Sequence, residues 1–350
     1  MDKKNYLYMF LACIIFISSS ILILSCSIPF QKQEKIQNIK IGISVYDEYD
    51  TFIAEMIKQV TQICKDKEKD TGVAITLDIV SAAGSQMTQN DQIERFADKK
   101  YDAVCVNLVD RTDASTIIDK ARSVNMPVVF FNRELVEEDL ERWDKLYYVG
   151  AIAEESGRMQ GEIVLDACEN DFASIDKNGD KKLQYIMLEG EAGHQDALIR
   201  TQKSIETIVN GGYEVDKLDS VIANWNREQA VTKMFTLLER YPYQIEVILA
   251  NNDDMALGAI DAYVSNGITN IPLIVGVNGE EEALEMVLSK KMEGTVFNNA
   301  YSQAKAIVEI AYASAVGEKI PDSVKILNGK YVYLPYTKIN YHNAQQFLNN

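Results

Sequence analysis

Short apolar runs alternate with amphipathic stretches along most of the chain. The runs that predict strands cover 40–46, 74–80, 103–107, 127–131, 184–188, 213–217, 246–250, 271–277 and 294–297. The stretches that predict helices lie near 53–68, 90–99, 115–125, 153–168, 196–209, 227–240, 253–265, 280–289 and 302–315. Several runs are apolar at nearly every position, which is typical of strands covered by helices on both faces. The alternation predicts an α/β fold with parallel sheets and right-handed crossovers.

The length of the chain indicates more than one such unit. Its 350 residues correspond to roughly two domains, and a break is expected near Gly150, after the strand-like run LYYVG. We therefore expect two doubly wound lobes. The first strand is followed by DEYDTF rather than a G-x-G-x-x-G loop, which argues against a dehydrogenase. His194 and Asp196 could imitate an acid–base pair, but no nucleophile accompanies them, so we expect no enzyme activity.

Composition narrows the class of partner. Apolar residues make up 47% and charged residues 25%, which is typical of a globular protein. The 35 basic and 52 acidic side chains give a net charge of −17. A chain this acidic repels phosphate backbones, so we expect no nucleic-acid partner.

The N-terminus differs from the rest. Lys3 and Lys4 precede an uncharged run that ends at Ser25-Cys26, a pattern typical of a secretory signal. The cysteine resembles that of a bacterial lipobox, which predicts a signal peptide over 1–25, a lipid on Cys26 and a tether over 26–37. The alternative is an uncleaved membrane anchor. Both place the body outside the cytoplasm, at the outer face of the cell membrane.

Polar and aromatic side chains follow the predicted strands, where open α/β sheets bind ligands. The candidates are Asp50, Phe52, Asn132, His194, Asp196, Arg200, Asn252, Asn278 and Asn298, joined by Trp225 in a polar loop. Aromatic rings can cover the apolar faces of a sugar ring, while amide, carboxylate and guanidinium groups serve its hydroxyls. The set therefore suits a monosaccharide.

Each candidate also has a purely structural explanation. Asp50 could be a helix N-cap. Asp196 and Arg200 could form a solvated i,i+4 pair. The asparagines could be turn residues, and Trp225 could cover a surface patch. It is the joint placement after successive strands that favours a binding site.

A second group of residues has oxygen-bearing side chains at a spacing that suits a hard cation. In DKNGDKKLQ, over 176–184, Asp176, Asn178 and Asp180 occupy positions 1, 3 and 5 of an EF-hand-type loop. Lys182 would supply its carbonyl at position 7, and Gln184 stands at position 9. Position 12, normally a bidentate glutamate, is Met187, so a carboxylate must come from elsewhere. The alternative is a polar Asn-Gly turn before a strand.

The chain resembles the galactose/glucose receptors of the bacterial periplasmic-binding-protein family over roughly 38–340. The segments that carry the resemblance include YDEYDTF, PVVFFNRE, DKNGDKKLQY, EGEAGHQDALIRT, EVILANNDDMALGA and GTVFNNAYSQAKA. The resemblance implies that the ten candidates bind the sugar, with Phe52 and Trp225 on its two faces. It also implies a structural Ca²⁺ held by Asp176, Asn178, Asp180, Lys182, Gln184 and the distant Glu246. The family usually has aspartate where Asn278 stands, which bears on sugar preference.

The resemblance further implies a type I periplasmic-binding-protein architecture. One lobe would comprise 38–150 and 300–335, and the other 152–297 and 337–350, joined by a three-segment hinge. Closure on galactose or glucose would deliver the sugar to an ABC transporter permease, with a chemoreceptor as a further partner and a monomer as the expected state. The alternatives are a receptor for another monosaccharide, such as a pentose, or a dedicated chemotaxis sensor. Lys181 and Lys182 should weaken the binding of calcium.

Overall fold

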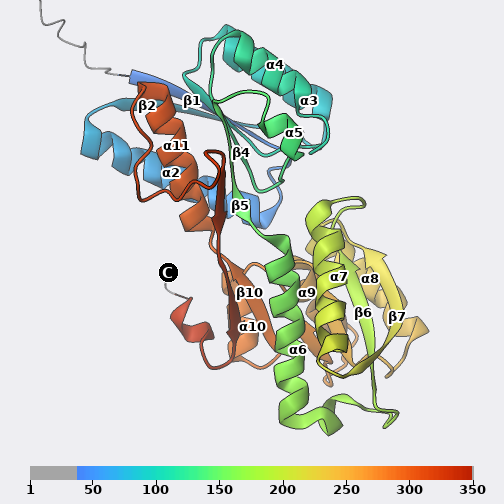
Figure 1. Cartoon of the computed structure of the whole chain (residues 1–350). Helices are drawn as coiled ribbons and strands as arrows, with labels where there is room; N and C mark the ends of the chain where they lie inside the picture. Colours follow the sequence, from blue (N-terminus) through green and yellow to red (C-terminus); the bar gives the residue numbers. More distant parts are fainter. Residues whose placement is uncertain (1–37, 349–350) are drawn as a thin grey trace, which may run out of the picture. The chain divides into compact units, whose positions relative to one another are not determined.

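The computed structural model describes residues 38–348 (Figure 1). The proposed signal peptide, Cys26 and the tether lie outside the described residues. Within them the chain forms two six-stranded sheets, each covered by helices. We call each sheet with its helices a lobe. The predicted α/β fold with two doubly wound lobes is confirmed.

The first sheet has the strand order β11-β5-β4-β3-β1-β2 and is parallel throughout. Its strands are β1 (Asn38–Val45), β2 (Ala74–Ser81), β3 (Ala103–Val106), β4 (Val128–Phe131), β5 (Leu146–Ala151) and β11 (Tyr331–Leu334). Its helices are α2 (Thr51–Thr71), α3 (Gln86–Asp98), α4 (Ser115–Ser123), α5 (Glu137–Leu140) and α11 (Ala300–Val316). Helices α2 and α11 bury one face of the sheet, and α3 and α4 bury the other (Figure 1).

The second sheet has the order β12-β10-β9-β8-β6-β7. Its strands are β6 (Lys182–Glu189), β7 (Glu214–Ile222), β8 (Val247–Ala250), β9 (Leu273–Val275), β10 (Gly294–Asn298) and β12 (Tyr336–Asn340). Its helices are α6 (Ala153–Ile175), α7 (Gln195–Asn210), α8 (Arg227–Arg240), α9 (Asp253–Ser265), α10 (Glu281–Leu288) and the short 3₁₀ helix η1 (Ala344–Gln346). Helices α6 and α7 cover one face, and α8, α9 and α10 cover the other.

One expectation about the sheets is wrong. The strand pattern predicted parallel sheets, but β12 pairs with β10 antiparallel. The reason is the path of the chain, which runs from β11 in the first sheet through Pro335 directly into β12 in the second. Because β10 ends at this same junction, a strand that starts there must run alongside β10 in the opposite direction.

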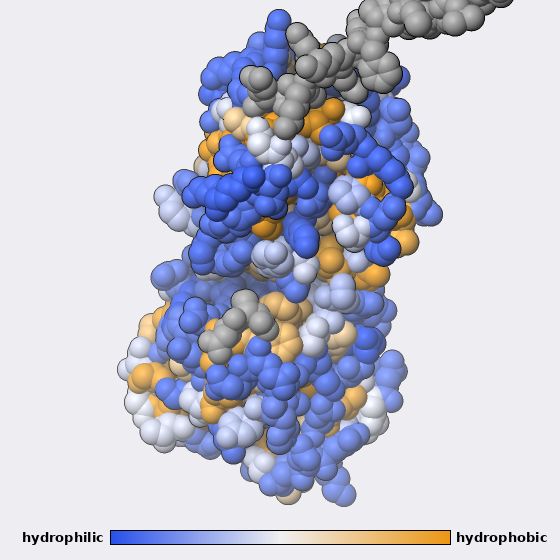
Figure 2. Space-filling model, turned by 90° about the vertical axis from the view of Figure 1, so that its left-hand side faces the viewer, coloured by the Kyte–Doolittle hydropathy of each residue, from blue (hydrophilic) through white to orange (hydrophobic). Residues whose placement is uncertain are grey.

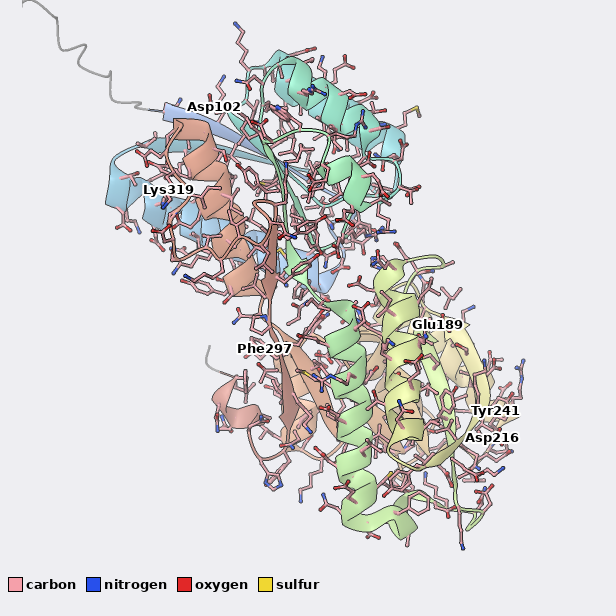
Figure 3. All side chains as sticks on the ribbon, in the orientation of Figure 1. Asp102, Glu189, Asp216, Tyr241, Phe297 and Lys319 are labelled. Carbon is pink, nitrogen blue, oxygen red and sulfur yellow. The ribbon has the colours of Figure 1, made fainter. Side chains whose placement is uncertain are left out.

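The chain passes between the sheets at three places. The first lies between β5 and α6, the second between β10 and α11, and the third between β11 and β12. Phe297, labelled in Figure 3, lies on β10 one residue before the second passage. Figure 3 also labels Asp102 and Lys319 on the first lobe and Glu189, Asp216 and Tyr241 on the second. Three adjacent single-chain connections are the architecture that permits hinged closure.

The described residues show a mainly polar face (Figure 2) and three buried cysteines. The face shown in Figure 2 is mainly hydrophilic, with scattered apolar patches. Among the described residues, none of the helices combines the length and hydrophobicity that a bilayer crossing requires. Cys64, Cys105 and Cys168 are free and buried, as expected for small apolar side chains.

Candidate functional site

All ten side chains predicted to bind a ligand line one cavity. Its lining consists of Asp50, Phe52, Asn132, His194, Asp196, Arg200, Trp225, Asn252, Asn278 and Asn298, together with Tyr46 and Arg133. The space inside this lining is about 370 Å³, a value that includes volume open to solvent. The lining comes from both sheets, at the carboxyl ends of their strands, which is where the strand-end rule places a site.

Asp50 is both a helix cap and a cavity residue. It precedes α2, and its Oδ1 accepts a hydrogen bond from the Ile53 amide at 2.9 Å. Its Oδ2 accepts from the Tyr46 hydroxyl at 2.7 Å. These two donors fix the carboxylate at the mouth of the first lobe. The N-cap explanation and the binding explanation are therefore compatible.

His194 is presented to the cavity as a neutral donor. It caps α7, and its Nδ1 accepts from the Asp196 amide at 3.1 Å. Burial, reinforced by Arg133, Arg200 and other nearby arginine charge, holds the pKa of His194 well below its usual value. The imidazole is therefore neutral with its proton on Nε2, which leaves that N–H available to a hydroxyl acceptor.

Asp196 and Arg200 form a buried pair rather than a solvated one. Their side chains are only 17% and 6% exposed, and Arg200 Nη2 lies 3.4 Å from Asp196 Oδ2. The guanidinium also donates to the Ser156 hydroxyl, the Asn251 carbonyl and the Tyr336 hydroxyl at 3.1, 2.9 and 3.1 Å. Burial raises the pKa of Asp196, and the neighbouring arginines oppose that shift. The pair is a rigid polar wall of the cavity.

Trp225 is held in place by its own backbone and its neighbours. Its φ of +61° lies in the left-handed region, and its carbonyl accepts from Asn252 Nδ2 at 3.0 Å. A Cβ at Gly190 would lie 2.1 Å from a ring atom, so only glycine fits there. The His194 ring meets the indole edge-on at 5.0 Å. The indole is 8% exposed and Phe52 7% exposed, and both line the cavity.

The four asparagines act in turns and caps while they line the cavity. Asn132 adopts a φ of +62° after β4, and Asn252 caps α9. Asn278 donates from Nδ2 to Glu280 Oε1 at 3.3 Å. Asn298, at the end of β10, accepts from Gln303 Nε2 at 2.6 Å. Their amides therefore have fixed orientations before any ligand is present.

The charges around the cavity balance. Asp50 and Asp196 face Arg133 and Arg200, while His194 is neutral. Two carboxylates and two guanidinium groups give a formal sum of zero. Transfer of an ion into such a cavity would leave one charge uncompensated, which is costly away from water. The cavity therefore favours an uncharged ligand with many hydroxyls.

Tyr46 and Arg133 are the lining residues that the sequence did not predict. The Arg133 guanidinium lies 3.6 Å from the centre of the Tyr46 ring. Burial, with a contribution from Asp50, raises the pKa of Tyr46 far above its usual value, so its hydroxyl stays protonated. A signal was present for Arg133, because it follows Asn132 directly, whereas Tyr46 ends the first apolar run and resembles a core residue.

A cluster of carboxyl groups lies where the lobes meet beside the cavity. The Thr51 hydroxyl of α2 lies 2.9 Å from both Asp254 Oδ2 and Glu280 Oε1. One hydroxyl has one proton to donate, so a second proton is required on one of the carboxyl groups. Asp253 accepts from the Thr295 hydroxyl and the Gly279 and Glu280 amides. Burial raises the pKa of Asp253 to about 6, although these three donors oppose the shift. Burial raises the pKa of Glu280 well above its ordinary value, so we assign the additional proton to Glu280.

From this cluster of carboxyl groups we expect the free energy of unfolding to fall as the pH rises. Burial, followed by repulsion from Asp253 and Asp254, raises the pKa of Glu280 well above its ordinary 4.5. Because the folded pKa exceeds the unfolded one, the contribution is complete below pH 4.5 and is lost as the pH rises through the folded value. The thermal midpoint of Glu280→Gln should therefore depend less on pH above 4.5 than that of the unaltered protein.

Glu282→Gln, in the first turn of the helix that Glu280 precedes, is the matched control. Hydrogen bonding to Arg227 lowers the pKa of Glu282, so this change should leave the fall in stability in place. Parallel pH profiles for the unaltered protein and Glu280→Gln would show that Glu280 holds no extra proton.

The carboxylate oxygens at the proposed calcium loop accept hydrogen bonds from the backbone amides of the loop. Asp176 accepts from the amides of Gly179 and Lys181 at 2.8 and 3.0 Å. Glu246 is 1% exposed and accepts from the amides of Lys177 and Gln184 at 2.6 and 3.0 Å. Burial raises the pKa of Glu246, and these amides oppose the shift. The distant carboxylate that the resemblance implies thus lies beside the loop.

The loop supplies the kind of oxygen ligands that a hard cation binds. The amide side chains of Asn178 and Gln184 would have to rotate to direct their oxygens at it. Gln184 accepts from Asn178 Nδ2 at 3.0 Å and donates to Asp180 Oδ2 at 2.9 Å. In residues 38–348, no group of three or more His, Cys, Asp or Glu side chains lies close enough together to hold a metal ion. A bound Ca²⁺ would require the amide oxygens of Asn178 and Gln184, rather than their nitrogens, to face the same point as the Asp180 carboxylate.

Comparison with known proteins agrees with the fold. Residues 41–319 match the family model described as a periplasmic binding protein domain. The D-galactose/methyl-galactoside binding periplasmic protein MglB of Haemophilus influenzae is 35% identical over 311 residues, which is 88% of this chain and 92% of that protein. The ribose import binding protein RbsB of Bacillus subtilis is 25% identical over 87% of this chain and 93% of that protein.

A solved structure shows the same architecture. An ABC transporter solute binding protein from Bacillus halodurans with bound myo-inositol superposes with a TM-score of 0.75 and 23% identity. The match covers 90% of this chain and 99% of that one. At this level of identity the likeness shows the fold, and the chemistry of the cavity must be argued from its own residues.

Proposed function

The chain belongs to the periplasmic binding protein domain family, and from this premise we propose that it captures galactose or glucose outside the cytoplasm and delivers it to an ABC sugar permease. The relatives reported above are named as binding proteins, and one of them serves ribose import, which supports a function without catalysis. The observation that carries the proposal is the cavity, where Phe52 and Trp225 accompany ten side chains that bear polar groups and no net formal charge.

Each part of the cavity serves one part of a pyranose. The two aromatic rings would cover the C–H faces of the sugar. Asp50 and Asp196 would accept from hydroxyls, Arg200 and His194 Nε2 would donate, and the asparagine amides would do both. Because these groups are already fixed by caps and ion pairs, little side-chain entropy is lost on binding.

Closure follows from the distribution of these groups over two lobes. Asp50, Phe52 and Asn132 belong to the first lobe, and His194, Asp196, Arg200, Trp225, Asn252 and Asn278 belong to the second. A sugar that contacts both sets binds the closed state more tightly and shifts the population toward it. The closed form is the state that we expect a permease to recognise, with a chemoreceptor as a further partner.

Calorimetric titration of residues 38–350 with a panel of monosaccharides tests this function. We expect galactose or glucose to bind most tightly, with pentoses weaker because they lack one hydroxymethyl group. Tighter binding of a pentose would replace the hexose assignment, and heat from none of the sugars would overturn the function. The panel also shows whether the neutral amide of Asn278 changes the preference.

We also propose that the second lobe binds a structural Ca²⁺ through Asp176, Asn178, Asp180, the Lys182 carbonyl, Gln184 and Glu246. When bound, the cation would stabilise the folded state by mass action. Support comes from the oxygen donors of the loop and from the position of Glu246 against it. Lys181 and Lys182 place positive charge on the same loop, which should weaken the affinity.

Glu246→Gln tests the cation site. The change should lower the thermal midpoint measured in millimolar calcium, because a neutral amide binds Ca²⁺ more weakly than a carboxylate. In chelator the shift should be smaller, because the amide oxygen can still accept from one of the two backbone amides and no ligand of a cation is lost. Equal shifts in calcium and in chelator would show that Glu246 is not a ligand.

We also propose that the chain is attached to the cell membrane. Lipid on Cys26 would hold the body at the outer face of the cell membrane, with 26–37 as the tether. Support comes from the signal pattern of the first 25 residues and from the family of the body. An uncleaved N-terminal anchor would give the same orientation without lipid.

A further inference from the structure

Gln303 is a buried polar residue on a helix whose buried face is otherwise apolar. It lies near the start of α11 and is 1% exposed. The other buried residues of this helix are alanine, isoleucine, valine and one tyrosine. Gln303 Nε2 donates to Asn298 Oδ1 at 2.6 Å, and among the described residues this is the one hydrogen bond that its side chain makes. The buried amide therefore serves a single partner.

The other end of this amide is unsatisfied. Gln303 Oε1 is buried, and no donor among the described residues reaches it. A buried carbonyl oxygen without a donor is unfavourable, and an apolar side chain of similar size would avoid the penalty. Such groups in native proteins require an explanation. Folding of α11 alone does not supply one, so we looked for it in the partner of Gln303.

That partner lines the cavity and belongs to the other lobe. Asn298 ends β10 of the second sheet, whereas α11 covers the first sheet, and only Asn299 stands between the two elements. Because Asn298 Oδ1 accepts from Gln303, the part of the amide that stays free is Nδ2, for which no described residue is an acceptor. The contact across the second passage thus leaves a hydrogen-bond donor available to a ligand.

We propose that Gln303 is a positioning residue for ligand binding, which holds the Asn298 amide so that its Nδ2–H donates to a hydroxyl of the sugar. This inference rests on the proposed function. An asparagine amide can present either its oxygen or its nitrogen, and the hydrogen bond from Gln303 selects the nitrogen before the sugar arrives. Less side-chain freedom is then lost on binding. Gln303 does not line the cavity itself, so it acts through Asn298.

A double-mutant cycle tests this assignment, with the affinity for galactose, or for the tightest-binding sugar of the panel above, as the readout. Gln303→Met keeps a similar volume and removes the donor. It should weaken binding by about 3- to 10-fold. In a protein that already carries Asn298→Ala, the same change should have little further effect, because the amide that Gln303 positions is gone. Calorimetric titration of the four proteins measures the affinities.

Gln160 is the matched control, since it is also a buried glutamine with an unsatisfied Oε1. Its Nε2 donates to the carbonyls of Ala250 and Val275 at 2.7 and 3.0 Å, which belong to the backbone of β8 and β9. Gln160→Met should therefore lower the thermal midpoint measured without sugar more than Gln303→Met does. Any effect of Gln160→Met on affinity should be the same with and without Asn298→Ala.

Two replacement variants keep the cycle measurable. Gln303→Leu replaces Gln303→Met if the latter does not fold, which thermal unfolding without sugar will show. Asn298→Ser replaces Asn298→Ala if the latter binds no sugar.

The outcomes separate this assignment from the proposed function. A loss of affinity in Gln303→Met that is smaller in the Asn298 variant supports the assignment. Unchanged affinity in Gln303→Met, or a loss at least as large in the Asn298 variant, overturns the assignment and leaves the proposed function intact. Failure of the unaltered protein to bind any monosaccharide overturns the proposed function and this assignment with it.

Discussion

Replacement of Trp225 by alanine should weaken hexose binding by about 30-fold or more, the loss of ~2 kcal/mol typical of a buried aromatic anchor. The indole is 8% exposed and lines the cavity. Gly190 and Asn252 hold it there through close packing and a hydrogen bond to its carbonyl. Its removal deletes one of two aromatic faces, and no neighbouring side chain can take its place. Titration calorimetry and fluorescence measure the effect.

Trp143 supplies the matched control, because the chain has two tryptophans. Trp143 packs against the core formed by α3, α4 and their strands, away from the cavity. Trp143→Ala should therefore keep the hexose affinity and the change in tryptophan fluorescence on binding. Trp225→Ala should lose that fluorescence change, since Trp143 alone would remain as the fluorophore. Unchanged affinity in Trp225→Ala would remove this residue from the site.

The sequence predicted the lobes because strand–helix alternation is a local property. Runs such as 103–107 and 127–131 are apolar on both faces and correspond to β3 and β4. The direction of β12 was not predictable in this way, since the pattern of a strand is the same for either direction. That direction depends on where β11 ends and on the pairing with β10, which are properties of the whole chain.

The lining of the cavity was likewise predictable where it depends on local sequence, and not where it depends on contacts between distant segments. The strand-end rule identified polar residues such as Asn132 and Asn298, because position in a parallel sheet determines which edge a residue occupies. Tyr46 ends an apolar run and looks like a core residue, so its hydroxyl contact with Asp50 could not be predicted. Glu246 is far in sequence from the loop that it contacts, and only the resemblance implied it. Contacts between distant segments require the fold.

Arg200→Met should cause the largest loss of stability among these changes, about 3–5 kcal/mol in the free energy of unfolding. Arg200 is 5% exposed and contacts groups on α6, the loop after β8, α7 and β12. Methionine fills a similar volume but leaves the buried Asp196 carboxylate without its charge partner. Because Asp196 lines the cavity, hexose binding should be lost as well. Denaturant unfolding measures the first effect and calorimetry the second.

A second arginine–carboxylate pair with the same spacing but greater exposure tests whether burial causes the loss of stability in Arg200→Met. Arg158 and Glu162 have the same i,i+4 spacing on α6, but their side chains are 49% and 32% exposed, against 6% and 17% for Arg200 and Asp196. Arg158→Met should therefore change the free energy of unfolding by no more than about 0.5 kcal/mol. Adding Asp196→Leu to Arg200→Met should recover part of the stability, since the unpaired charge is then gone, but not the binding of sugar. Equal small effects at both arginines would mean that the Asp196–Arg200 pair is solvated and that the cavity wall is not rigid.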